Sequence, residues 1–131
     1  MMTGLLVGAW YTTFTSAVEK PMEYKKCLQQ AQKNEEKGIY YDAILEYKKA
    51  LEYDGDNRNI YMKIAEDYRN MGDDSGFVDA CNSAISLDGD KEQAILTLAD
   101  YYVEQDEKQD AIALLKKHIK KKKNSGALKA K

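Results

Sequence analysis

The chain has 131 residues, 44% hydrophobic and 32% charged, which is enough to bury the core of one folded domain. Its net charge of −2 is unevenly spread: all 22 acidic residues lie at or before Asp110 with 12 basic ones, whereas the stretch from Ala111 onward has eight lysines and no acid. This distribution argues against a nucleic-acid-binding surface along the whole chain.

The chain begins with a leader, residues 1–20, which carries no charge from Met1 to Val18. It lacks the basic start of a signal peptide, and it is too short and too polar for a complete membrane-spanning helix. Two interpretations remain open. The leader is either the end of a membrane anchor, with Trp10 and Tyr11 at the lipid boundary, or a local segment that packs on the helices that follow.

Six amphipathic helices are expected after the leader, at residues 22–37, 40–53, 57–70, 74–86, 91–105 and 108–122. Their apolar residues are spaced by three and four, as in Ala43, Ile44, Tyr47 and Ala50. The segments between them are rich in Gly and Asp, which are typical of helix ends and helix starts. A single proline in the chain leaves the helices uninterrupted.

The helices form three copies of equal length that follow one another without a gap. When the copies are aligned, small or aromatic residues coincide at equivalent positions, and turn residues separate the helices. Small side chains at fixed positions let helix backbones approach to about 8–10 Å. The coinciding sets are Ala31, Ala65 and Ala99; Asn34, Tyr68 and Tyr102; Gly38, Gly72 and Asp106; Ala43, Phe77 and Ala111; Tyr47, Cys81 and Leu115; Ala50, Ala84 and His118; and Gly55, Gly89 and Lys123.

This pattern resembles the tetratricopeptide repeat (TPR) family, whose period is 34. The second copy has the family's small-then-tyrosine signature at Ala65 and Tyr68, and the first copy has its alanine, aromatic, alanine signature at Ala43, Tyr47 and Ala50. The resemblance implies an all-α fold, a right-handed α-solenoid of three helix-turn-helix repeats. The repeats would occupy residues 24–57, 58–91 and 92–125 within a domain spanning 21–125.

The sequence also departs from the family pattern. Gly55, Gly89 and Lys123 stand where the family usually closes each repeat with proline. Asn34 replaces a tyrosine, and His118 replaces the last small residue of the third copy. Residues 126–131 are expected to begin a capping helix that continues beyond this chain, because a solenoid normally covers its last apolar flank.

The sequence contains no arrangement that predicts catalysis, so no enzyme activity, cofactor or metal site is expected. The Asp-Gly-Asp segments at 54–56 and 88–90 are followed by bases rather than by the ligands of a calcium loop, and they are interpreted as helix boundaries. Cys27 and Cys81 lie far apart, with His118 as the only histidine, which argues against a zinc site. Both cysteines are expected to be reduced core residues.

The resemblance places a ligand-binding surface on the first helix of each repeat. The apolar residues Leu28, Met62 and Leu96 recur there at equivalent positions of the three copies, and Glu35, Glu66, Asp100 and Glu104 favour a basic partner. The alternative is ordinary scaffold surface, or a surface filled by the leader. The predicted peptide-binding residues are Lys25, Leu28, Gln32, Glu35, Asn59, Met62, Glu66, Arg69, Gln93, Leu96, Asp100 and Val103.

These features favour a non-catalytic scaffold that binds a peptide segment of another protein. Family members that bind chaperone carboxyl tails have Lys and Asn where this chain has Leu28, Gln32 and Thr97, so that activity is not expected. The alternative function is a structural tether or self-association module between a membrane anchor and a downstream domain. The lysine-rich end, Lys116, Lys117 and Lys120 to Lys123, either complements a helix dipole or binds acidic lipids or nucleic acid. The sequence does not decide between a cytoplasmic and a membrane-tethered protein.

Overall fold

The computed structural model describes residues 20–130 and their side chains as far as residue 119. This part of the chain is all-α and contains no strand, as predicted. The leader, and with it both interpretations of residues 1–19, lies outside the described residues. The helices are α2 (Met22–Glu36), α3 (Tyr40–Leu51), α4 (Arg58–Asn70), α5 (Asp74–Ser86), α6 (Glu92–Glu104) and α7 (Lys108–Ala130).

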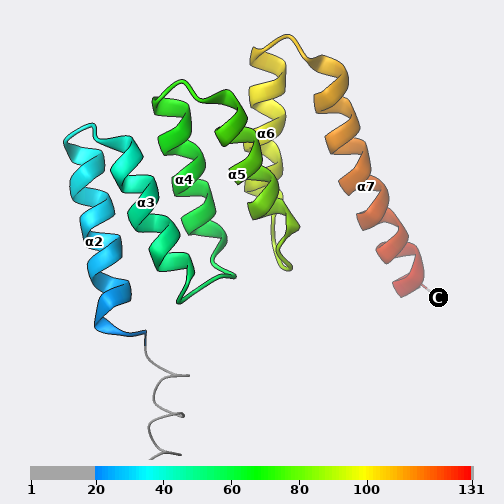
Figure 1. Ribbon diagram of the computed structural model, residues 1–131. Coiled ribbons are helices and arrows are strands. Elements are labelled where there is room, and N and C mark those ends of the chain that lie inside the picture. Colours follow the sequence, from blue (N-terminus) through cyan, green and yellow to red (C-terminus); the bar gives the residue numbers. More distant parts are fainter. Residues whose placement is uncertain (1–19, 131) are drawn as a thin grey trace, which may run out of the picture.

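The helices pack against their neighbours in chain order, and consecutive helices run in opposite directions (Figure 1). The pairs α2 with α3, α4 with α5, and α6 with α7 each form one hairpin. Contacts of α3 with α4 and of α5 with α6 join one hairpin to the next. The predicted bounds of α2 to α6 agree with the structure to within two residues at each end.

The turn inside each hairpin has the same geometry in all three copies. Gly38, Gly72 and Asp106, which occupy equivalent positions, have φ angles of 75°, 77° and 61°, in the left-handed region. In each turn the following N–H donates to the carbonyl five residues earlier, over 2.8 Å, 2.9 Å and 2.7 Å. This hydrogen bond closes the helix end in a Schellman motif, which ordinarily requires glycine. The three copies therefore share not only residues at equivalent positions but also the same backbone conformation at the turn inside each hairpin.

Asp106 is the one non-glycine residue with a positive φ in the described chain, so Asp106→Gly should be stabilising. Glycine adopts this conformation without a steric cost, and part of that gain is offset by its larger entropy in the unfolded chain. We expect the free energy of unfolding to rise by about 0.5–1 kcal/mol in urea melts. The matched control, Gly72→Ala, should lower it by about 1 kcal/mol. A loss of stability in Asp106→Gly would contradict the strained turn.

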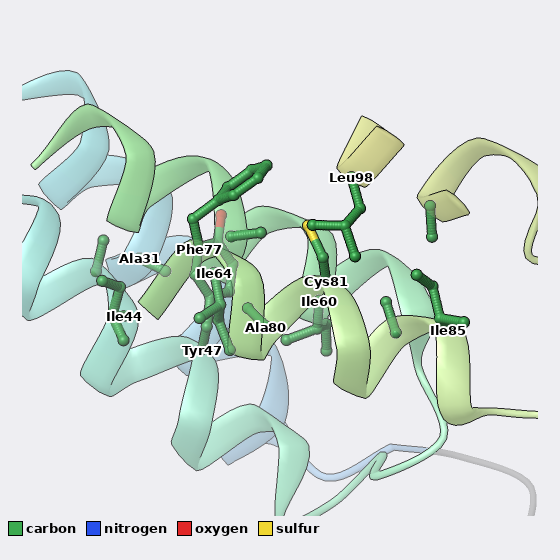
Figure 2. Packing of buried hydrophobic residues seen from close by; sticks show 14 of the residues in the cluster. Ala31, Ile44, Tyr47, Ile60, Ile64, Phe77, Ala80, Cys81, Ile85 and Leu98 are labelled. Carbon is green, nitrogen blue, oxygen red and sulfur yellow. The ribbon is translucent and has the colours of Figure 1, made fainter. Parts of the chain in front are cut away.

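Small buried residues line the contacts between helices, at the positions that coincide in the sequence. Ala31, Ala65, Ala43, Ala50 and Ala84 are fully buried. Larger apolar side chains fill the space around them (Figure 2). The burial of these alanines confirms the predicted core positions and explains how neighbouring helices approach closely.

Among the described residues, Phe77 is the largest fully buried side chain, and it takes the place that alanine has in the other two copies. Its ring lies 4.9 Å from the ring of Tyr101, centre to centre, at an interplanar angle of 49°. It thus joins α5 to α6. Cys81 is also fully buried, whereas Cys27 is half-buried, and both thiols are free.

Helix α7 is longer than predicted. A helix end at residue 122 and a new start near Asn124 and Ser125 are expected from the sequence, but α7 continues without a break to Ala130. The predicted end is therefore wrong. No proline interrupts the segment, and Gly126 costs only about 1 kcal/mol relative to alanine within a helix. The lysine, alanine and leucine residues around it are good helix formers.

Candidate functional site

The predicted binding residues all lie on the first helix of a hairpin, four each on α2, α4 and α6. None of their side chains is buried, so each can reach a ligand. Leu28 and Met62 are half-buried and pack against the core, whereas Leu96 is 42% exposed. The predicted apolar stripe thus consists of two partly covered side chains and one open one.

A pocket of about 590 Å³ forms where the starts of α4 and α6 meet the loops that precede them. It brings together three predicted residues from two copies, Asn59, Met62 and Gln93. Met62 provides the deformable apolar surface expected of an adaptable contact. The complete lining is Asp54, Asp56, Asn57, Arg58, Asn59, Met62, Asp90, Gln93 and Ala94.

Three carboxylates and one guanidinium line this pocket, but the guanidinium of Arg58 is already occupied. Its Nε donates to the carbonyl of Ala84 over 2.9 Å, and its Nη2 donates to those of Leu87 and Asp88, each over 2.8 Å. These carbonyls lie at the end of α5, where a cation is favourable. The pocket therefore offers a ligand mainly negative charge.

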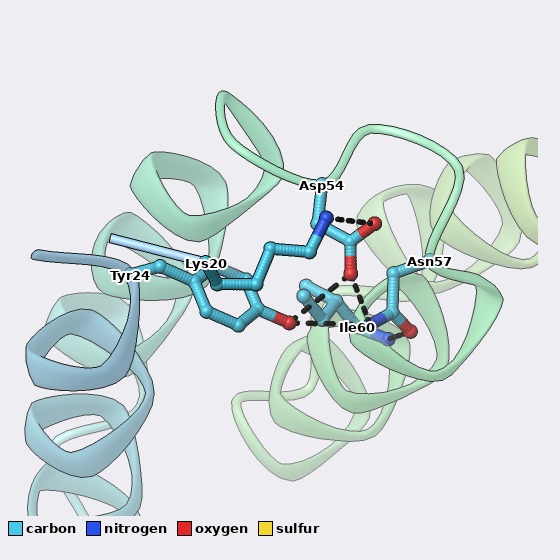
Figure 3. A network of polar contacts seen from close by, with 5 residues as sticks. All are labelled: Lys20, Tyr24, Asp54, Asn57 and Ile60. Atoms are coloured by element: carbon cyan, nitrogen blue, oxygen red, sulfur yellow. Dashed lines mark hydrogen bonds and ion pairs between the residues drawn. The ribbon is translucent and has the colours of Figure 1, made fainter. Parts of the chain in front are cut away.

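A polar network holds the loop on one side of the pocket (Figure 3). Asp54 Oδ2 accepts hydrogen bonds from Asn57 Nδ2 over 2.9 Å and from the Tyr24 hydroxyl over 3.1 Å, and Oδ1 lies 3.4 Å from Lys20 Nζ. The bond from Asn57, followed by those from Tyr24 and Lys20, lowers the pKa of Asp54 despite its partial burial. Asn57 also caps α4 by accepting from the Ile60 N–H over 3.3 Å. The Asp54 carboxylate is thereby fixed and ionised.

Arg69 and Glu104 form an ion pair that links α4 to α6. The Arg69 guanidinium carbon also lies 5.3 Å from the centre of the Phe77 ring and 6.0 Å from that of Tyr101. The sequence predicts that Arg69 contacts a partner and that Glu104 favours a basic one. The structure adds that the two side chains pair with each other within the chain.

A buried acid pair lies between the first and second hairpins. Asp67, on α4, is only 1% exposed, and Glu35, on α2, is half-buried. Asp67 Oδ2 and Glu35 Oε1 are both buried without a hydrogen-bond partner among the described residues. Burial, followed by the negative charge of Glu35, raises the pKa of Asp67 to about 7. Burial and then Glu35 also raise the pKa of the Tyr47 hydroxyl, on α3, well above its ordinary value.

The burial of Asp67 was not expected from the sequence, although the spacing of apolar residues on its helix indicates it. Ile60, Ile64 and Asp67 are spaced by four and three, which places Asp67 on the buried face of α4. The Asp-Gly-Asp segments are correctly predicted as helix boundaries, but their convergence on one pocket depends on how the hairpins stack. Only the folded chain shows it.

No protein-family model matches the chain, and no curated protein matches it significantly. None of the helices within residues 20–130 is long and apolar enough to cross a membrane. The same residues contain no cluster of three or more His, Cys, Asp or Glu side chains that could hold a metal ion. The leader and the side chains of residues 120–123 of the lysine-rich end, where membrane contact is predicted, lie outside the described residues.

Proposed function

We propose that the chain is a non-catalytic scaffold of the TPR type, a right-handed solenoid of three repeats that binds a peptide segment of another protein on the surface of α2, α4 and α6. The repeated Schellman turns and the buried alanines at equivalent positions of successive copies support the repeat assignment. The pocket in which Asn59 and Met62 of one repeat meet Gln93 of the next carries the functional proposal. A ligand placed there contacts two repeats at once.

The chemistry of the pocket favours a peptide with an apolar residue next to a basic one. Met62 offers the apolar contact, and Asp56 and Asp90 are exposed carboxylates beside it. Energy in such interfaces is concentrated in a few well-packed contacts. Exposed carboxylates act mainly on the association rate and its salt dependence. The partner is therefore a basic, partly apolar segment whose binding weakens with salt.

Selection of a random dodecapeptide library against the intact chain tests this function. The enriched peptides should combine Lys or Arg with Leu, Met or aromatic residues. Met62→Ala should weaken the binding of a selected peptide about 30-fold, measured by fluorescence anisotropy, in keeping with about 2 kcal/mol for a central contact. Leu45→Ala is the matched control, since Leu45 is an exposed apolar residue on α3, and it should change binding less than threefold.

Two outcomes would exclude this surface as the binding site. One is equal weakening by Met62→Ala and Leu45→Ala. The other is unchanged folding and peptide capture after simultaneous substitution of Leu28, Met62 and Leu96 by serine. In that case the binding surface would have to be sought at the lysine-rich end or in the leader.

A further inference from the structure

We propose that the leader binds back onto the helices of its own chain and inserts the indole ring of Trp10 into a second pocket, which lies between α3, α4 and α5. This pocket has a volume of about 320 Å³, within the roughly 300–1,000 Å³ range of ligand pockets. The inference goes beyond the proposed function, because it gives the leader a binding site on a different side of α4.

Helix α4 contributes to both pockets, but with different sides. Tyr61, Ile64 and Tyr68 are spaced by three and four residues and line the second pocket together. Met62 follows Tyr61 directly, which places it about 100° around the helix, and it lines the acidic pocket instead. The two pockets therefore offer separate binding sites.

The interior of the second pocket is apolar and is bounded by flat rings. Leu51 on α3 and Ala80 on α5 add aliphatic surface to the two tyrosine rings of α4. Gly76 on α5 makes room for the ring of Tyr68, because a Cβ atom there would lie 2.5 Å from the ring. Glycine within a helix costs about 1 kcal/mol relative to alanine. Such a pocket suits a flat aromatic side chain.

The polar groups of this pocket favour a ligand without charge. Lys48 and Asp79 are exposed and carry opposite charges, so the pocket has no charge in excess. Lys48 Nζ donates to the Tyr68 hydroxyl over 3.2 Å. The Ser83 hydroxyl donates to the carbonyl of Asp79 over 3.1 Å, and its oxygen can still accept a hydrogen bond. A neutral ring with one N–H or O–H donor complements this arrangement.

The leader supplies such a side chain. Its residues from Met1 to Val18 carry no charge, and its most apolar stretch, Gly4 to Trp10, ends in the only tryptophan of the chain. An indole ring combines a large apolar surface with one N–H donor, which matches the interior of the pocket and the Ser83 oxygen. The basic peptide expected at the acidic pocket does not match it.

The leader joins the helices close to this pocket. Lys20 Nζ lies 3.4 Å from Asp54 Oδ1, and Asp54 comes three residues after Leu51 of the pocket. The start of α2 and the end of α3 lie at the same end of the first hairpin (Figure 1).

The leader is also long enough. Trp10 precedes Lys20 by ten residues, which span up to roughly 33 Å when extended, whereas the 12 residues of α3 extend over only about 18 Å. Trp10 can therefore reach every part of the pocket. A short tether also gives the leader an effective concentration of the order of millimolar, so that even a weak contact is occupied.

Tryptophan fluorescence of the intact chain tests this binding, because Trp10 alone contributes to it. The emission maximum should lie at shorter wavelength than in the urea-unfolded chain, and acrylamide should quench it less, at any protein concentration. Ser83→Leu fills the pocket and should abolish most of this difference while the circular dichroism stays helical. Ser75→Leu, the same substitution at an exposed position of α5 outside the pocket, should leave the emission unchanged.

Nuclear Overhauser spectroscopy provides a second measurement that needs no substitution. Contacts are expected between the indole protons of Trp10 and the methyl groups of Ile64 and Ala80, which line the pocket. Contacts of the indole with the methyl groups of Leu28 and Met62 instead would place the leader on the predicted peptide-binding surface and overturn the inference.

Three fluorescence results would also overturn it. One is an equal response to Ser83→Leu and Ser75→Leu in variants that remain folded. Another is an emission like that of the unfolded chain which shifts only when phosphatidylcholine vesicles are added, since the leader would then be a membrane anchor. The third is a shift that grows with protein concentration, which indicates that the leader binds a second copy of the chain.

Discussion

Replacing Phe77 by alanine is expected to lower the free energy of unfolding by about 3–5 kcal/mol, the range for removing a buried aromatic ring from a core. Phe77 is 2% exposed and packs on Tyr101, so its loss leaves a cavity where α5 meets α6. It also removes the ring over which Arg69 lies. A domain of this size has a total stability of about 5–15 kcal/mol. The variant should therefore be close to unfolding at 37 °C.

Urea denaturation followed by circular dichroism measures this effect. Tyr41→Ala is the control, because Tyr41 is an aromatic residue that is 60% exposed. Its truncation should cost less than about 0.5 kcal/mol. If the two variants lose similar amounts of stability, Phe77 does not occupy the core between α5 and α6.

Replacing Asp67 by asparagine is expected to stabilise the protein by about 1–3 kcal/mol at pH 8, although it alters a fully buried residue. Asparagine has nearly the same shape as aspartate and can form hydrogen bonds, but it carries no negative charge. The sign follows from the raised pKa of Asp67, from 3.8 to about 7. Between these values the folded protein holds a proton that the unfolded chain releases, so the stability of the natural protein falls as pH rises through this window and then levels off.

Thermal and urea melts at pH 4, 6 and 8 should show this difference growing with pH and nearly vanishing at pH 4, where Asp67 is protonated in the folded protein. The control Asp100→Asn changes an exposed acid on α6 and should parallel the natural protein within about 0.5 kcal/mol. A constant difference between Asp67→Asn and the natural protein at all three pH values would contradict the buried acid pair.

Sequence periodicity alone was sufficient to predict the all-α class, the bounds of α2 to α6 and the buried alanines. Helix boundaries depend on local chemistry, and Gly38, Gly72 and Asn57 carry it within a few residues of each boundary. The far end of α7 was missed because Asn124 and Ser125 are equally compatible with a helix start and with a helix interior. No local signal separates the two.

The candidate site was only partly predictable, because it depends on contacts between hairpins. Position along an amphipathic helix shows which side chains are not fully buried. None of the predicted binding residues is fully buried, although Leu28 and Met62 pack against the core. The pairing of Arg69 with Glu104 and the meeting of Asp54 with Asp90 depend on distances between hairpins, which the chain does not encode locally.

The order of residues along the chain was enough to establish where the helices begin, which faces they bury and where glycine-rich or polar turns separate them, because these depend on residues within one or two helical turns. The packing of the hairpins was needed to place Asp67 against Glu35 rather than in water, and to open Met62 into a pocket shared with Gln93. The ionisation of a carboxyl group depends on every charge and dipole around it. Those neighbours come from helices that are distant in the sequence, and only packing brings them together.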